Sequence, residues 1–267
     1  MYKIFDAHCH IYPDAIAPKA VEGIEHFYGN LPFEPYDGTT ATLLKVGRKA
    51  GISHYVVHSV ATAPHQISSI NRYIADEVKK SEGQFTGLGT LHPDSEHPDQ
   101  DLKELLALGL KGVKLHPDFQ RFEADSSKAK RIYELCSEAG IPILVHTGDR
   151  RFDYSNPNRV VNVLRDFPKL KVVGAHFGGW SVWDEAVRLL SEHENFYIDT
   201  SSTFYAVGLE KGKELINSWG AERILFGTDY PMWKPQLDID CLLQMELKDD
   251  EYRRIFWDNA VSVFGDV

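Results

Sequence analysis

Two histidines near the start of the chain have the spacing of metal ligands on a strand. His8 and His10 lie in the segment Asp6-Ala-His-Cys-His10. Because alternate residues of a strand point to the same face, both imidazoles would face one side and Cys9 the other. Two neutral imidazoles one pleat apart can bind one divalent ion. By itself, this short motif fits a surface or core histidine pair equally well.

Three further segments end an apolar run in one residue that can bind a metal. They are Ile-Leu-Val-His146-Thr-Gly, Val-Val-Gly-Ala-His176-Phe-Gly-Gly and Ile-Leu-Phe-Gly-Thr-Asp229-Tyr-Pro. A single such histidine is more often a hydrogen-bonded core or turn residue. Several independent strands that place such residues together with the HxH pair favour a metal centre.

These residues follow strands that alternate with helices along the whole chain. The strand segments are rich in β-branched and aromatic residues, and from the third onward they recur every 24 to 30 residues. Eight such units in one chain of 267 residues predict an α/β fold, a (β/α)8 TIM barrel, as a single domain over residues 1–267. The segments are Lys3–His8, Ser53–His58, Phe85–Leu91, Gly112–His116, Pro142–His146, Val172–His176, Phe196–Thr200 and Ile224–Asp229.

The polar residues gather at the carboxyl ends of these strands, where TIM barrels carry their chemistry. Seven of the twelve histidines end the first six strands, and Asp199 and Asp229 end the last two. The histidines are His8, His10, His58, His92, His116, His146 and His176.

The first connection is too long for a simple βα unit. We expect an insertion after strand one, with a helix over Pro18–Phe27, a Pro-rich loop and a second helix from near Thr40. Phe33 and Tyr36 of this insertion could cover a pocket or anchor the insertion to the barrel.

Composition excludes several other classes of protein. The chain is 43% hydrophobic with a formal net charge of −10 and has no Lys/Arg run, so nucleic acid is not an expected partner. No apolar run approaches the roughly 18 residues of a membrane helix, and no secretory signal is evident. Three cysteines without a CxxC pair are expected to be reduced thiols. We therefore expect a cytoplasmic protein that binds no membrane.

Taken together, these motifs resemble those of the amidohydrolase superfamily. Asp-Ala-His-Cys-His, Gly-Val-Lys-Leu-His-Pro, Ala-His-Phe-Gly-Gly and Gly-Thr-Asp-Tyr-Pro are similar to the amidohydrolase-related branch. That branch includes the aminocarboxymuconate-semialdehyde decarboxylase-like enzymes and several lactone hydrolases. The resemblance covers the whole chain and implies a distorted TIM barrel with a metal centre, but it does not specify the substrate.

The resemblance also implies roles for individual residues. His8, His10, His146 and Asp229 would bind one Zn²⁺ or another divalent ion, which would lower the pKa of a bound water from its value in bulk solvent toward roughly 7. His176 would act as acid or base, or else as a further ligand or a structural hydrogen-bonding group. Asp229 could bind the metal, accept the proton of the water, or do both.

Strand four differs from relatives with two metal ions, which have a bridging Glu or carboxylated Lys there. This chain has Lys114-Leu-His116 and no Glu, which favours one ion. Lys114 could form an ion pair with Asp6 or Asp199, or become carboxylated.

Four residues around this core are candidates for substrate binding. They are Arg150, Arg151, His116 and Trp180. A loop arginine beside a metal suits bidentate binding of a carboxylate, and a tryptophan suits a flat substrate. The alternatives are a solvated arginine and a tryptophan in the first turn of a packed helix.

The primary prediction is a metal-dependent hydrolase that acts on a small carboxylated amide, lactone or ester. The alternative is a non-oxidative, metal-dependent decarboxylase on the same scaffold. A TatD-type nuclease also uses HxH, but the missing strand-four Glu and the acidic charge count against it. A catalytically silent metal-binding protein is the remaining possibility. A small molecule is the expected partner, and a homodimer is a family-level expectation.

Overall fold

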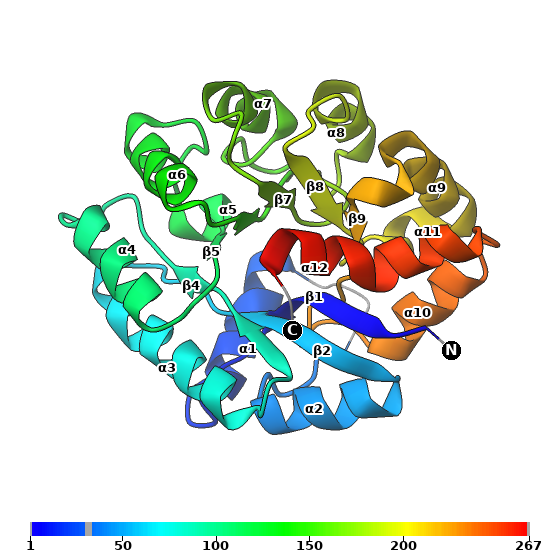
Figure 1. Cartoon of the computed structure of the whole chain (residues 1–267), viewed down its shortest axis with the longest axis horizontal. Helices are drawn as coiled ribbons and strands as arrows, with labels where there is room; N and C mark the ends of the chain where they lie inside the picture. The colour runs from blue at the N-terminus through cyan, green and yellow to red at the C-terminus, as the bar shows by residue number, and fades with distance from the viewer. Residues whose placement is uncertain (1, 30–33, 266–267) are drawn as a thin grey trace.

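The computed structural model describes residues 2–29 and 34–265. In these residues a ring of short parallel strands is surrounded by helices (Figure 1). The strands are β1 (Ile4–His10), β2 (Ile52–His58), β3 (Phe85–Gly87), β4 (Gly89–Thr90), β5 (Val113–Leu115), β6 (Ile143–Val145), β7 (Val172–Gly174), β8 (Phe196–Asp199) and β9 (Ile224–Leu225).

Helices follow the strands in the alternating order that the sequence predicts. They are α1 (Ala17–Tyr28), α2 (Thr40–Lys49), α3 (Ile67–Lys80), α4 (Pro98–Ala107), α5 (Pro117–Gln120), α6 (Ser127–Ala139), α7 (Pro157–Asp166), α8 (Trp183–Leu190), α9 (Phe204–Trp219), α10 (Pro235–Leu243), α11 (Asp249–Arg253) and α12 (Asn259–Phe264).

Two hydrogen-bonded sheets make up the ring, in the orders β1-β2-β3 and β4-β5-β6-β7-β8-β9. Only Leu88 separates β3 from β4, and its N–H donates to the carbonyl of Val57 at 3.0 Å, so the third predicted strand links both sheets. At the other side the chain after β9 runs beside β1. Ala7 N donates to Phe226 O at 2.8 Å and His10 N donates to Tyr230 O at 2.7 Å. The predicted α/β fold of the TIM-barrel type is thereby confirmed.

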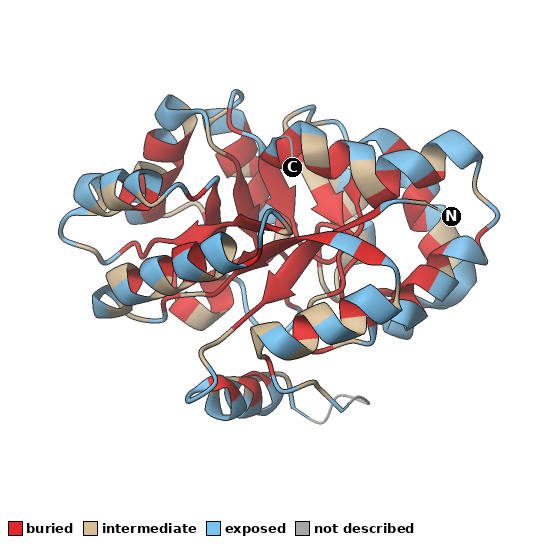
Figure 2. Cartoon of the chain, turned by 60° about the horizontal axis from the view of Figure 1, so that its bottom comes forward, coloured by how far each residue is buried: buried red, intermediate tan, exposed pale blue. Residues whose placement is uncertain are grey.

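Apolar side chains fill the two layers that such a barrel requires. The inner layer contains Phe5, Val56, Leu144, Val173 and Leu225, one from each of five strands, and α12 packs against it. The outer layer lies between the strands and the surrounding helices, whose inner faces are buried and whose outer faces are exposed (Figure 2). Because α12 covers the amino-terminal end of the inner layer, the polar strand ends lie at the opposite end of the barrel.

The insertion after β1 contains the two predicted helices, α1 and α2. Thr39 caps α2 by accepting a hydrogen bond from Thr42 N at 3.3 Å. Tyr36 stacks on Tyr230 with ring centroids 5.9 Å apart, and this contact anchors the insertion to the barrel. Phe33 lies outside the described residues.

None of the helices in residues 2–29 and 34–265 combines the length and the apolar composition that crossing a membrane requires.

Candidate metal centre

Three of the four predicted metal ligands meet at the carboxyl ends of the strands. His8 and His10 come from the end of β1, and Asp229 follows β9. The two Nε2 atoms are 3.2 Å apart, and each lies 3.4 Å from Asp229 Oδ1. Ligands about 2.1 Å from one tetrahedral ion are separated by about this much. The donor set of two imidazoles and a carboxylate therefore fits a divalent ion.

Asp199 determines how His8 faces this centre. His8 Nδ1 donates to Asp199 Oδ2 at 2.8 Å, and both side chains are fully buried. Asp199 also accepts hydrogen bonds from the backbone N–H groups of His176 and Ser201, at 3.1 and 3.0 Å, and from Ser201 Oγ. With its proton on Nδ1, His8 directs the lone pair of Nε2 toward His10 and Asp229.

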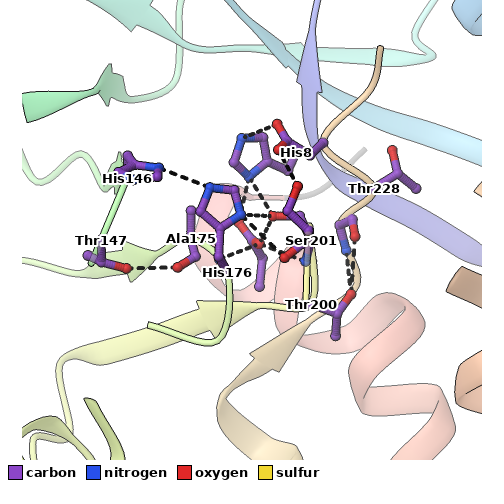
Figure 3. A network of polar contacts seen from close by, with 12 residues as sticks. His8, His146, Thr147, Ala175, His176, Thr200, Ser201 and Thr228 are labelled. Carbon is purple, nitrogen blue, oxygen red and sulfur yellow. Dashed lines mark hydrogen bonds and ion pairs between the residues drawn. The ribbon is translucent and has the colours of Figure 1, made fainter. Parts of the chain in front are cut away.

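The fourth predicted ligand, His146, lies beside His176. His146 Nε2 donates to the carbonyl of Gly148 at 3.1 Å, which leaves the lone pair on Nδ1. That atom lies 3.0 Å from His176 Nε2, and the contact is drawn as a dashed line in Figure 3. Among the described residues, no hydrogen bond or ion pair joins His146 directly to His8, His10 or Asp229.

His176 continues this network toward His8. Its Nδ1 lies 2.8 Å from Ser201 Oγ, which is also 3.2 Å from His8 Nδ1 (Figure 3). His176 and Asp229 both have left-handed backbone conformations, with φ values of 61° and 59°. Such conformations cost free energy in non-glycine residues and concentrate at functional sites.

Lys114 contacts the centre, but it does not form the ion pair that the sequence suggested. Its Nζ donates to His8 Nε2 at 3.1 Å, and within the described part of the chain it forms no salt bridge with Asp6 or Asp199. Asp6 instead accepts hydrogen bonds from the backbone and hydroxyl of Thr228. Burial lowers the pKa of Lys114 to about 8, although Asp199 and Asp229 act in the opposite direction.

Burial favours the neutral, metal-binding form of three imidazoles of the site, those of His10, His146 and His176. It lowers the pKa of His10 and of His176 to about 4, and it lowers the pKa of His146 well below its usual value. Burial alone would raise the pKa of Asp229, but the adjacent His8 and His10 outweigh it and hold that pKa well below the usual value. At neutral pH the centre therefore offers lone pairs and a carboxylate.

His116 connects the site to the insertion. The N–H of Phe119 donates to His116 Nδ1 at 3.2 Å, so the ring hydrogen is on Nε2. Nε2 in turn donates to the hydroxyl of Tyr28, 3.0 Å away at the end of α1. The ring of His116 stacks on His146 at a centroid distance of 4.0 Å. His116 thus positions Tyr28 from beside a predicted metal ligand.

The two predicted substrate-binding arginines have different surroundings. Arg151 donates to both carboxylate oxygens of the buried Asp149, at 3.0 and 2.7 Å, and to the carbonyl of Phe27 at 2.8 Å. The hydrogen bonds of Arg151 therefore hold α1 against the loop after β6. Arg150 is exposed, and its backbone N–H donates to Ser181 Oγ at 3.0 Å.

Trp180, the predicted aromatic contact, lines a small pocket over the centre. The volume of the pocket is about 20 Å³, roughly the room of one water molecule. A larger groove of about 670 Å³ lies between α1 and α3 and reaches His10. The small pocket is lined by Tyr28, His176, Trp180, Ser202, Tyr205, Asp229, Met232 and Trp233.

Sequence reasoning missed several members of this site. Ser202 Oγ donates to Asp229 Oδ2 at 2.5 Å and accepts from Trp233 Nε1 at 2.7 Å. The polar run Thr-Ser-Ser directly after Asp199 was a signal that could have indicated Ser201 and Ser202. Tyr28 had no local signal, because its partner His116 is 88 residues away in the chain.

Neutral imidazoles and carboxylates at the carboxyl ends of parallel barrel strands define a class of protein, the metal-dependent TIM-barrel enzymes. The family model described as amidohydrolase matches residues 5–265. This chain therefore belongs to the amidohydrolase family, in its amidohydrolase-2 branch.

The individual proteins that this chain resembles share low sequence identity with it. A 2-amino-3-carboxymuconate-6-semialdehyde decarboxylase of Dictyostelium discoideum is 24% identical over 238 residues, which cover 73% of this chain. The match spans 65% of the length of that relative, just under two thirds.

Solved structures show the same fold. An uncharacterised TIM-barrel protein of Bordetella bronchiseptica has a TM-score of 0.82 with 24% identity, covering 98% of each chain. A 5-carboxyvanillate decarboxylase of Novosphingobium aromaticivorans has a TM-score of 0.76 with 15% identity, covering 98% of this chain and 96% of that one. That structure contains manganese and 4-hydroxy-3-methoxy-5-nitrobenzoic acid.

Proposed function

We propose that this protein is a metal-dependent, non-oxidative decarboxylase of a small, flat, hydroxylated carboxylic acid. A decarboxylase was the alternative prediction from the sequence, and we prefer it here to the primary prediction of a hydrolase. The decarboxylases among the similar proteins support it. The observation that carries it is the aromatic lining of the pocket beside Asp229 and His176.

That lining suits the loss of CO₂. Tyr28, Trp180, Tyr205 and Trp233 surround the pocket, and Tyr205 and Trp233 stack at a centroid distance of 4.4 Å. Aromatic walls suit contact with a flat ring and solvate a localised carboxylate charge poorly. The space that they enclose has the room of about one water molecule, so a ring enters only when these side chains move apart. Once a proton has added to the ring carbon, breaking the carbon–carboxylate bond returns its electron pair to the π system, so the charge of the carboxylate disappears and the apolar surroundings favour the transition state over the bound acid.

We assign His8, His10, His146 and Asp229 to the metal, as in the sequence prediction. A bound Zn²⁺, Mn²⁺ or similar ion would act as a Lewis acid toward the oxygens of the substrate. Asp229 can also accept the proton of a substrate hydroxyl, because it is ionised at neutral pH and borders the pocket. His176, with Ser201 behind Nδ1, can carry a proton at Nε2 to the carbon that loses CO₂.

Product analysis tests this function. The protein, loaded with Zn²⁺ or Mn²⁺, is incubated in D₂O with a panel of hydroxybenzoates, 5-carboxyvanillate, lactones and amides. We expect release of one CO₂ per product and incorporation of one deuterium at the carbon that carried the carboxylate. Conversion of a lactone or amide without CO₂, with oxygen from solvent in the product, would instead establish hydrolysis.

A further inference from the structure

His58 is a buried histidine at the end of β2. The proposed function gives it no role. Its side chain is fully buried, and neither Nδ1 nor Nε2 has a hydrogen-bond partner within the described residues. Leaving polar groups of this kind without partners is unfavourable, because they lose their hydrogen bonds to water and gain none in the protein. The fold therefore places an unsatisfied imidazole at the carboxyl ends of the strands.

Other buried histidines of the described chain differ in this respect. His54 Nε2 bonds to Thr86 Oγ1 at 3.0 Å, and His116, His146 and His176 each have partners on both ring nitrogens. His92 accepts a hydrogen bond from Asp94 N. The absence of any partner thus sets His58 apart from the histidines that serve as structural hydrogen-bonding groups.

The position of His58 indicates what its partner would be. Its ring lies edge-on to that of His10, with centroids 4.4 Å apart, and 5.0 Å from that of His8. One ligand nitrogen from each of the three histidines lies within 4.8 Å of the others. The register of β1 and β2 explains this grouping, because His10 and His58 are paired residues on neighbouring parallel strands.

We propose that His58 is an additional nitrogen ligand of the metal centre and increases its selectivity for Zn²⁺ over Mn²⁺. Imidazole nitrogen suits zinc, whereas manganese prefers oxygen ligands, so a further imidazole beside His8 and His10 shifts the site toward zinc. A neutral imidazole keeps one lone pair on its ring, and no hydrogen bond from the described residues occupies that of His58. The proposal rests on the metal centre of the proposed function.

The test measures metal binding rather than activity. The full chain, stripped with a chelator, is titrated with Zn²⁺ and with Mn²⁺ in the wild type and in the variants His58→Asn and His58→Gln. We expect the variants to lose zinc affinity by roughly 100-fold and manganese affinity by clearly less. The visible spectrum of Co²⁺-loaded protein should change in the same variants, because its band intensities depend on the number of ligands.

His92→Asn is the matched control, since it also removes a buried histidine at a strand end that has one unpartnered nitrogen. It should leave both metal affinities and the Co²⁺ spectrum unchanged. Equal zinc affinity in the wild type and the folded His58 variants would overturn the His58 proposal and leave the proposed function intact. A wild type that binds no divalent ion would contradict both.

A measurement on the unaltered protein avoids any dependence on how the variants fold. The ring ¹⁵N resonances of His58 are followed by NMR as Zn²⁺ is added. A large shift of one ring nitrogen, in step with those of His8 and His10, supports coordination. Ring nitrogens of His58 that do not respond to saturating Zn²⁺ overturn it.

Discussion

His8 Nδ1 lies 2.8 Å from Asp199 Oδ2, and this contact joins the end of β1 to the end of β8 across 191 residues of sequence. It fixes the imidazole hydrogen on Nδ1 and leaves Nε2 to face His10 and Asp229. The geometry of the centre thus depends on a carboxylate that touches none of the reacting atoms.

Replacing Asp199 by asparagine should therefore weaken metal binding. An amide can still occupy the same space, but it loses the charge that holds His8 in the required tautomer. We expect the affinity for Zn²⁺ or Mn²⁺ to fall by about 10–100-fold, measured by titration of the metal-free protein. Asp76→Asn, an exposed change on α3, is the control and should bind metal like the wild type. An unchanged affinity in Asp199→Asn would show that His8 is oriented by other contacts.

Tyr28→Phe tests the role of the insertion. Because His116 Nε2 donates to the hydroxyl of Tyr28, the proton of this hydroxyl is free to donate to a substrate oxygen in the pocket. Loss of that one hydrogen bond should lower kcat/KM by about tenfold while the ring packing remains. The control Tyr197→Phe lies on β8 beside the inner apolar layer and should leave kcat/KM unchanged. Equal kcat/KM values for Tyr28→Phe and the wild type would exclude this contact with substrate.

Gly148→Ala should destabilise the fold around the site. Gly148 has φ of 80°, and a Cβ atom there would lie 2.6–2.7 Å from backbone atoms of Gly179 and Trp180. Gly140→Ala is a matched control, because Gly140 has φ of 68° with open space around it. We expect the control to lower the free energy of unfolding by about 1–2 kcal/mol, the cost of the left-handed conformation alone. Gly148→Ala should lower the free energy of unfolding clearly more, measured by denaturant unfolding. Equal losses in the two variants would mean that the loop of Gly148 and the loop of Gly179 move apart easily.

Asp238 should make stability depend on pH. Burial raises the pKa of this α10 carboxyl well above its usual value, with added repulsion from Asp6 and Asp229. Folding therefore favours the protonated acid. This contribution is complete below the unfolded pKa of about 3.9 and is lost as the pH rises through the higher folded pKa.

The Asp238→Asn variant removes that titration. Its stability relative to the wild type should increase as the pH is raised from 4 to 9, measured as Tm at each pH. The exposed neighbour Asp240 provides the control, since Asp240→Asn should follow the pH profile of the wild type. A constant difference between Asp238→Asn and the wild type would mean that Asp238 does not titrate over this range.

The eight strand positions could be predicted because short apolar runs end abruptly in polar residues. The structure shortens most of these strands and divides the third at Leu88, where the backbone changes partner from β2 to β5. Such an exchange depends on the curvature of the whole ring, so it leaves no pattern in the local sequence.

The metal-binding residue types could be predicted from spacing, but their partners could not. His8 was expected at the centre, whereas its contacts with Asp199 and Lys114 depend on how strands far apart in sequence are arranged. Arg151 shows the opposite case. The buried carboxylate that engages it, Asp149, is only two residues away, and this proximity indicates an internal ion pair before any substrate is considered.

A dependence of CO₂ loss on a divalent ion at His8, His10 and Asp229 follows from the proposed function. Its most direct test is the rate of ¹³CO₂ release from the carboxyl-labelled acid that the panel identifies, measured with metal-free, metal-loaded and Asp229→Asn protein. We expect release only from the metal-loaded wild type, with activity restored to the metal-free protein when the ion is added back. Equal release from chelator-stripped protein, or an undiminished rate in Asp229→Asn, would contradict it.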